Sequence, residues 1–219
     1  LNREPVVDHG VRHADWRSYA RSMLGVLRGD RRFRGFLAYQ SLAYCYVVGQ
    51  GLFMVHTLRT FQLSDAVTGD FVMVSTGAVV LGSLLLGRLG DRYGHRLVLG
   101  LTAASYAAAA FLAAAAWDWR VMYPAFALLT VAIAGQMISM QNLVYQFAPR
   151  GRRPTYVAVA AAVPAPFVLL YVLAAGPAMR AFGPRPVFAG SGVLALASLA
   201  VLLAMGRPRN PDESRSETT

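Results

Sequence analysis

The stretch GRLGDRYGHR, residues 87–96, decides how the rest of the chain is interpreted, because it lies between two long apolar runs. Its ten positions hold three arginines, one aspartate, one histidine and three glycines. Charge at this density is too costly for a hydrocarbon layer, so the stretch predicts a connection between two segments that are buried in one. The rest of the sequence tests that interpretation.

The composition favours a membrane protein. Of 219 residues, 56% are hydrophobic and only 15% are charged, whereas a soluble domain carries about 25% charged residues. All 21 basic residues are arginine and the net charge is +10, which in a soluble protein would suggest a nucleic-acid partner. Because the arginines lie between apolar runs rather than along one surface, we predict a lipid bilayer as the partner and no nucleic acid.

Six stretches free of aspartate, glutamate, lysine and arginine can be marked, and each is long enough to cross a bilayer, which takes roughly 17–25 helical residues. They are residues 35–58, 71–87, 97–117, 121–149, 155–179 and 186–206. The predicted fold class is therefore an all-α membrane protein, a six-transmembrane-helix bundle occupying residues 35–206. Pro164-Ala165-Pro166 predicts a kink in the fifth span, because two prolines remove two backbone donors.

The arginines predict the orientation of the bundle. Short connections make neighbouring helices antiparallel, so the loops alternate between two sides of the membrane. One side receives Arg59, Arg120, Arg180 and Arg185, and the other receives the remaining seventeen arginines. The positive-inside rule then places both termini in the cytoplasm of a multi-pass protein of the cell membrane, meaning an inner or plasma membrane.

The two ends of the chain differ from the spans. Residues 1–34 are expected to form a cytoplasmic linker, in which Trp16, Tyr19, Met23 and Leu27 follow helical spacing. That spacing fits an interfacial helix, or a solvated linker with chance periodicity. The polar residues 207–219 are predicted to be disordered. The polar start without methionine suggests a fragment of a longer protein.

The charged stretch resembles the loop signature of the major facilitator superfamily, G-x-L-(small)-D-R-x-G-(R/K)-(R/K)-x-x-L. The matching positions are Gly87, Leu89, Asp91, Arg92, Gly94, Arg96 and Leu99, while His95 stands where a fixed positive charge is usual. Gly94 permits a turn with positive φ, and the charged residues can reach the ends of neighbouring helices. We interpret Gly87, Asp91, Arg92, Gly94 and Arg96 as a conformational latch; a plain positive-inside turn is the alternative.

The resemblance extends along the chain and implies the C-terminal six-helix half of a twelve-helix transporter. Its partner would be the missing N-terminal six-helix half, with a small-molecule substrate between the two. Polar side chains within the spans are the candidates for that cavity, because they are costly in lipid. They are Gln40, Tyr44, Gln50, Gln136, Ser139, Asn142 and Gln146. The alternative role is hydrogen bonding between helices, and for Gln146 capping or a loop contact.

The sequence predicts no enzyme. The spans carry no mid-membrane acidic or basic side chain, and we find no catalytic set, no metal-spaced cluster and no cofactor motif. We therefore predict secondary active transport of an unidentified small molecule by alternating access, with export as one suitable direction. The alternative function is a six-span structural or regulatory membrane protein, in the form of a homodimer, without transport activity.

Overall fold

The computed structural model describes residues 16–64, 66–149 and 151–205, and in these ranges it is helical with no strand. The predictions for residues 1–15, for the tail 207–219 and for the side chains of Trp16 and Tyr19 fall outside the described residues. The all-α membrane fold predicted from the sequence is confirmed.

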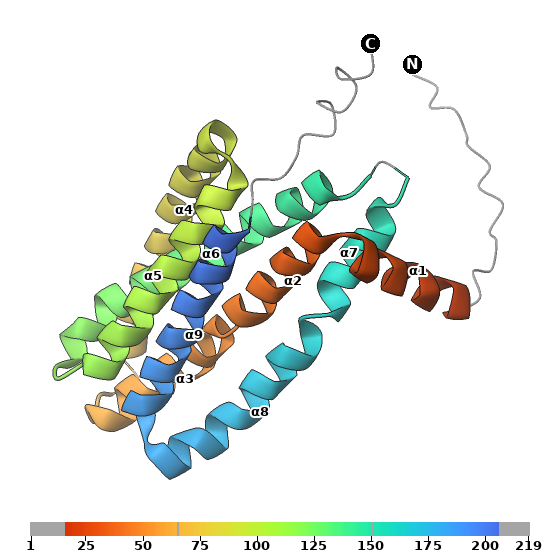
Figure 1. The fold of residues 1–219 in the computed structure, drawn as a ribbon. Helices are drawn as coiled ribbons and strands as arrows, with labels where there is room; N and C mark the ends of the chain where they lie inside the picture. The colour runs from red at the N-terminus through yellow and green to blue at the C-terminus, as the bar shows by residue number, and fades with distance from the viewer. Residues whose placement is uncertain (1–15, 65, 150, 206–219) are drawn as a thin grey trace, which may run out of the picture.

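Nine α-helices and one short 3-10 helix follow each other in the described ranges. They are α1 (Trp16–Gly29), α2 (Arg31–Ala43), α3 (Tyr46–Thr60), α4 (Val67–Tyr93), α5 (His95–Ala115), η1 (Trp119–Val121), α6 (Met122–Phe147), α7 (Arg153–Ala162), α8 (Ala165–Phe182) and α9 (Pro184–Ala204). The helices run back and forth along a single bundle (Figure 1), as short connections require.

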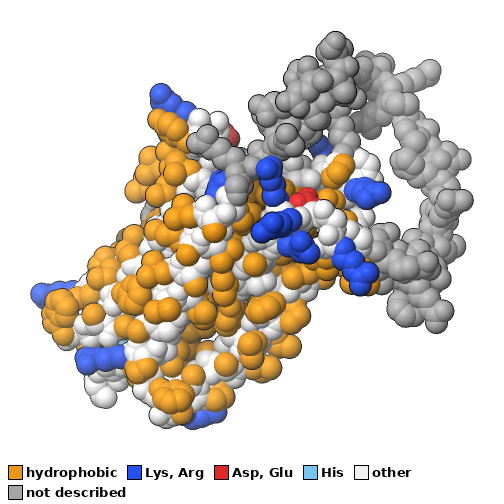
Figure 2. Space-filling view, in the orientation of Figure 1, with side chains coloured by type: hydrophobic (Ala, Val, Ile, Leu, Met, Phe, Trp, Pro, Cys, Tyr) orange, Lys and Arg blue, Asp and Glu red, His pale blue; other side chains and the backbone are white. Residues whose placement is uncertain are grey.

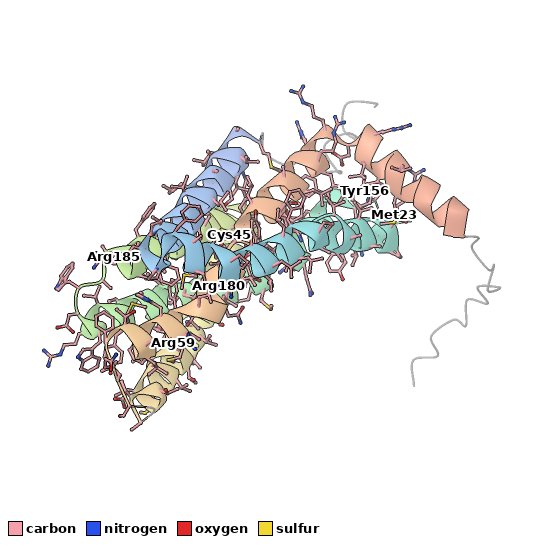
Figure 3. The ribbon with its side chains drawn as sticks, turned by 90° about the horizontal axis from the view of Figure 1, so that it is seen from below. Met23, Cys45, Arg59, Tyr156, Arg180 and Arg185 are labelled. Atoms are coloured by element: carbon pink, nitrogen blue, oxygen red, sulfur yellow. The ribbon has the colours of Figure 1, made fainter. Side chains whose placement is uncertain are left out.

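The two ends of the bundle collect different helix termini. The starts of α2, α5 and α7 and the ends of α4, α6 and α9 lie at one end, which we call the arginine-rich end (Figure 1). At the opposite end α4 and α9 begin, and α3, α5 and α8 finish. Figure 3 shows Arg59, Arg180 and Arg185 on the far side of Cys45 from Met23 and Tyr156. The arginine distribution found in the sequence is thus a property of the folded bundle.

Five helical segments are long and apolar enough to cross a membrane, counted over the described residues. They are α4, α5, the η1–α6 segment, the α7–α8 segment and α9. The first predicted span, residues 35–58, differs because it is divided into α2 and α3, which have 13 and 15 residues. The two pieces together still supply a sixth crossing of the bundle (Figure 1).

The division between α2 and α3 is a local tightening of the helix. Both Tyr44 and Cys45 keep right-handed helical φ and ψ values. Some backbone amides here, however, bond to the carbonyl three residues earlier instead of the carbonyl four residues earlier. The amide of Cys45 bonds to the carbonyl of Leu42, and the amide of Val48 bonds to that of Cys45. Such 3-10 turns have poorer geometry than an α-helix and often mark strained positions.

The fifth span is interrupted where the sequence predicts it. Helix α7 ends at Ala162 and α8 begins at Ala165, because Pro164 and Pro166 cannot donate backbone hydrogen bonds to the preceding turn. The predicted kink is therefore confirmed.

The charged stretch is more helical than its composition suggests. The sequence predicts a connection at residues 88–96, yet α4 continues to Tyr93 and α5 begins at His95. Arginine and aspartate do not end a helix, so α4 and α5 continue into the charged stretch. Gly94 alone makes the turn, with φ 93° and ψ 145°, a conformation that favours glycine.

Helices α5 and α6 form the centre of the bundle, with α9 and α4 packed against them. Small residues allow this close approach: a Cβ at Gly135 of α6 would collide with the side chains of Thr102 and Leu86. Aromatic clusters fill the space on either side of the centre. Phe33, Phe36, Phe147 and Tyr156 pack together at the arginine-rich end, and Phe53, Phe71, Phe126 and Phe188 pack at the other.

Candidate functional site

The exposed surface of the bundle is of two kinds, and the first is mostly apolar. Helices α4 and α8 present large hydrophobic side chains outward, among them Leu81, Leu85, Leu170 and Leu173, which are 59–65% exposed. Figure 2 shows hydrophobic side chains over most of the body of the bundle. A surface of this composition is what lipid chains solvate, so the protein is a multi-pass membrane protein in contact with the bilayer.

The second kind of exposed surface is polar and lies on α6. Gln141, Asn142, Tyr145 and Gln146 are all exposed along its last two turns, and Met137 precedes them with 68% of its surface exposed. Helix α3, which contacts α6, exposes Gln50. Amide groups at such positions are costly against lipid, so this face fits an aqueous cavity or a protein partner better than acyl chains. We call these six residues the polar face.

Tyr44 lies beside the polar face at the junction of α2 and α3. Its hydroxyl is 3.6 Å from the sulfur of Met140 on α6, and its ring centroid is 5.7 Å from that of Tyr46. Tyr44 is half-buried. Thioether and aromatic groups adapt to ligands of varied shape, so Tyr44 and Met137 add an adaptable apolar element to the amides.

Gln40 lies in the interior of the bundle. It is fully buried, and its Nε2 donates to the carbonyl of Ala160 at 2.8 Å. That carbonyl is four residues before Pro164, whose missing N–H would otherwise have bonded to it. Gln40 therefore satisfies a backbone acceptor that the α7–α8 kink exposes.

Gln136 is also interior, with 4% of its surface exposed. The Tyr39 hydroxyl lies 3.1 Å from both Gln136 Oε1 and the carbonyl of Leu99. The Tyr39 hydroxyl thus links α2 to α5 through the Leu99 carbonyl and to α6 through Gln136. The Nε2 of Gln136 has no hydrogen-bond partner among the residues that the structure describes, which is uncommon for a buried amide.

The predicted stripe of Ser139, Asn142 and Gln146 does not lie on one surface. Ser139 is fully buried, and its hydroxyl is 3.3 Å from Nδ1 of His95 at the start of α5. Asn142 is exposed and bonds to the carbonyl of Ile138 one turn back. Gln146 lines a groove beside His95 and Arg96. Of the seven predicted cavity residues, the polar face includes Gln50, Asn142 and Gln146, with Tyr44 at its edge.

A polar group that the sequence analysis did not single out lies where the first span divides. The Tyr106 hydroxyl of α5 is 3.1 Å from the carbonyl of Cys45 and 2.9 Å from Oγ of Ser191 on α9. The thiol of Cys45 is 3.4 Å from the carbonyl of Ser191. Tyr106 follows Ser105 in an alanine-rich run, and this pair of hydroxyls was the signal that could have drawn attention to it.

The predicted latch residues surround the α4–α5 turn. Arg96 donates to the carbonyls of Leu202, Leu203 and Met205, which are the last acceptors of α9. These carbonyls have no helical partner and carry the negative end of the helix dipole. Asp91 and Arg92 are exposed, and the Arg92 guanidinium lies 5.4 Å from the Tyr93 ring centroid. Gly87 has open space around it, and Gly94 makes the turn.

No group of three or more metal-ligating side chains occurs within the described ranges. The geometry offers instead an apolar exterior, a polar face on α3 and α6, and interior hydrogen bonds between helices.

Comparison with known proteins gives one match. The family model described as Major Facilitator Superfamily matches residues 36–219. No curated protein and no solved structure match the chain.

Proposed function

We propose that this chain, which belongs to the major facilitator superfamily, is a six-helix half of a secondary transporter and that its polar face forms one wall of the substrate cavity. The family consists of membrane transporters, and the bundle described above has the apolar exterior that such proteins need. The finer assignment, a C-terminal half that pairs with an N-terminal one, rests on the signature at residues 87–99 and on the basic segment before the first span.

The observation that carries the proposal is the exposure of amides on α3 and α6. Gln50, Gln141 and Asn142 are exposed, whereas the exposed residues of α4 and α8 are mostly apolar. A cavity between two halves of a transporter lies at such a polar face, and the halves rock around it. The buried residues Gln40, Gln136 and Ser139 form hydrogen bonds between helices of this half. They affect the substrate only indirectly, through the shape of the half.

The α4–α5 turn supports an alternating-access mechanism. Arg96 ties the start of α5 to the end of α9, so these two helices move as one unit at the arginine-rich end. Asp91 and Arg92 are exposed beside that unit, where they are free to contact the other half in one of its positions. We propose that the arginine-rich end is cytoplasmic, in a cell membrane, with both termini on that side.

Transport can be tested without knowing the substrate. Cells that express the wild-type protein, Asn142→Ala, Asp91→Asn or an empty vector are compared by mass spectrometry of small molecules in the medium and in cell extracts. We expect at least one small molecule whose distribution changes with the wild-type protein, and a weaker change with both variants at equal expression. Identical profiles for the wild-type protein and the empty vector would overturn the transport function.

The polar face can be tested separately. Cysteine is introduced at Asn142 and Tyr145, and at Leu81 and Leu170 as matched controls on the apolar surface. Thiols react with maleimide in water, so we expect labelling at positions 142 and 145 and little at 81 and 170. Equal labelling at all four positions would remove the distinction on which the cavity wall depends.

A further inference from the structure

We propose that an anionic phospholipid of the leaflet at the arginine-rich end binds in a groove beside α2, with its phosphate on Arg31 and Arg34 and an acyl chain running toward the α7–α8 kink. The proposal concerns a lipid site and is independent of what the protein transports.

The groove has a volume of about 460 Å³ and is lined by residues of three helical segments. Its lining includes Leu27 of α1, Arg34, Ala38 and Leu42 of α2, and Val163 and Phe167 at the α7–α8 kink. Apart from Arg34 and a buried Ser41, the lining side chains are apolar. An apolar groove inside a bilayer is filled by lipid chains rather than by water.

The groove exists because α8 departs from the line of α7. The direction of the chain changes at Val163 and Pro164, between α7 and α8 (Figure 1), and Phe167, with 42% of its surface exposed, stands at the bend. On the other wall, Ala38 has too small a side chain to close the space. Arg34 and Leu42 are eight residues apart, so the groove follows α2 for about 12 Å into the membrane.

Charge is placed at one end of this groove. Arg34 lines it directly, and Arg31, three residues earlier, lies on the same face of α2. Both are exposed, as is Arg28 at the end of α1. Figure 2 shows arginine side chains gathered over the α1–α2 junction. Guanidinium groups bind phosphate through paired hydrogen bonds, and basic sites between membrane helices bind anionic head groups.

The carboxylate of Asp30, which precedes Arg31 in the sequence, bonds to other groups. Asp30 caps α2, and its Oδ1 accepts from the amides of Arg32 and Phe33 at 3.0 and 2.9 Å. Its Oδ2 accepts from the Tyr156 hydroxyl at 3.4 Å. The carboxylate is thus directed at the start of α2 and at α7, whereas the side chains of Arg31 and Arg34 are exposed.

The test uses the full chain, purified and placed in nanodiscs of phosphatidylcholine with or without phosphatidylglycerol. Native mass spectrometry measures lipid retained after detergent transfer, and thermal unfolding measures the stabilisation by phosphatidylglycerol. We expect the wild-type protein to retain phosphatidylglycerol preferentially. The double variant Arg31→Gln/Arg34→Gln should lose that preference by about tenfold or more, since each arginine near the surface contributes about 1 kcal/mol to anionic-lipid binding.

Two further variants separate the site from diffuse attraction. Arg88→Gln removes an exposed arginine of α4 at the same end and should retain the preference. Ala38→Trp fills the groove while keeping both arginines, and should displace the lipid. Arg31→Lys/Arg34→Lys, which keeps the charge, should keep most of the preference and shows that the segment still folds. Equal losses in Arg88→Gln and the double variant, or full retention in Ala38→Trp, would overturn the proposal, as would a wild-type protein without preference.

Discussion

Single polar residues in this bundle have two distinguishable roles, and burial separates them. Gln40, Gln136 and Ser139 contact partners on other helices and have 0–4% of their surface exposed. Gln50, Asn142 and Gln146 are exposed. The first group contributes to stability, about 0.6 kcal/mol for an average hydrogen bond between membrane helices. The second group is available to a ligand or to another half.

The pairing of Gln40 with the carbonyl of Ala160 leads to a prediction at this scale. Gln40→Leu should lower the stability of the folded protein by about 1–2 kcal/mol, because a buried carbonyl loses its donor. In a Pro164→Ala background, the new amide at position 164 can bond to Ala160, so Gln40→Leu should then cost much less. Thermal unfolding of the four proteins in detergent gives the coupling between the two sites. Additive losses would show that the two residues act independently.

Sequence patterns identified these polar residues but not their partners. Glutamine inside an apolar run indicates a buried or cavity-facing amide, and here Gln40 and Gln136 are buried whereas Gln50, Gln141 and Gln146 are exposed. The stripe at 139, 142 and 146 was correct in its helical spacing, yet α4 and α5 pack over one side of α6 and cover Ser139 only. Which residues of a helix are covered depends on how neighbouring helices pack against it. The sequence of that helix alone does not give this information.

At the scale of helices, most crossings were predictable because hydrocarbon thickness limits their length and composition. Pro164 and Pro166 made the second interruption predictable as well. The division at Tyr44 and Cys45 was not, since neither residue breaks a helix by itself. The Cys45 carbonyl is bonded by Tyr106, sixty-one residues further along the chain. A contact with a hydroxyl so distant in the sequence leaves no local signal.

The contact between α5 and α6 gives a prediction for these elements. Gly135→Ala places a methyl group against Thr102 and Leu86, and we expect a loss of about 1–3 kcal/mol from overpacking. Gly176→Ala in α8 is the matched control, because its new Cβ meets nothing within 4 Å. That substitution should be neutral or stabilise by up to about 1 kcal/mol. The folded fraction after heating, measured by size-exclusion chromatography, compares the two. Equal behaviour would mean that α5 and α6 are not in close contact.

At the scale of the whole molecule, arginine is distributed between two ends of an otherwise apolar body. The described arginines of the arginine-rich end are in α1, α2, α4, α5, α7 and the residue before α7, and Arg59, Arg120, Arg180 and Arg185 lie at the other end. This asymmetry could be predicted from the sequence, because the arginines in each connection between spans can be counted directly. The grooves on the sides of the bundle could not be predicted from the sequence, since they depend on the angles between helices.

The same asymmetry yields a prediction about orientation. In intact cells, Arg120→Cys should react with a membrane-impermeant maleimide added outside, and Arg88→Cys should react only after the membrane is permeabilised. The native Cys45 is fully buried between α2 and α3, so it should contribute little background, and the Cys45→Ala protein measures what remains. The positive-inside rule, which counts the arginines near each span, predicts that the arginine-rich end is cytoplasmic. Reversed labelling would contradict this prediction and place the arginine-rich end outside the cell. The groove beside Arg34 would then face the outer leaflet, and the lipid that it selects would have to come from there.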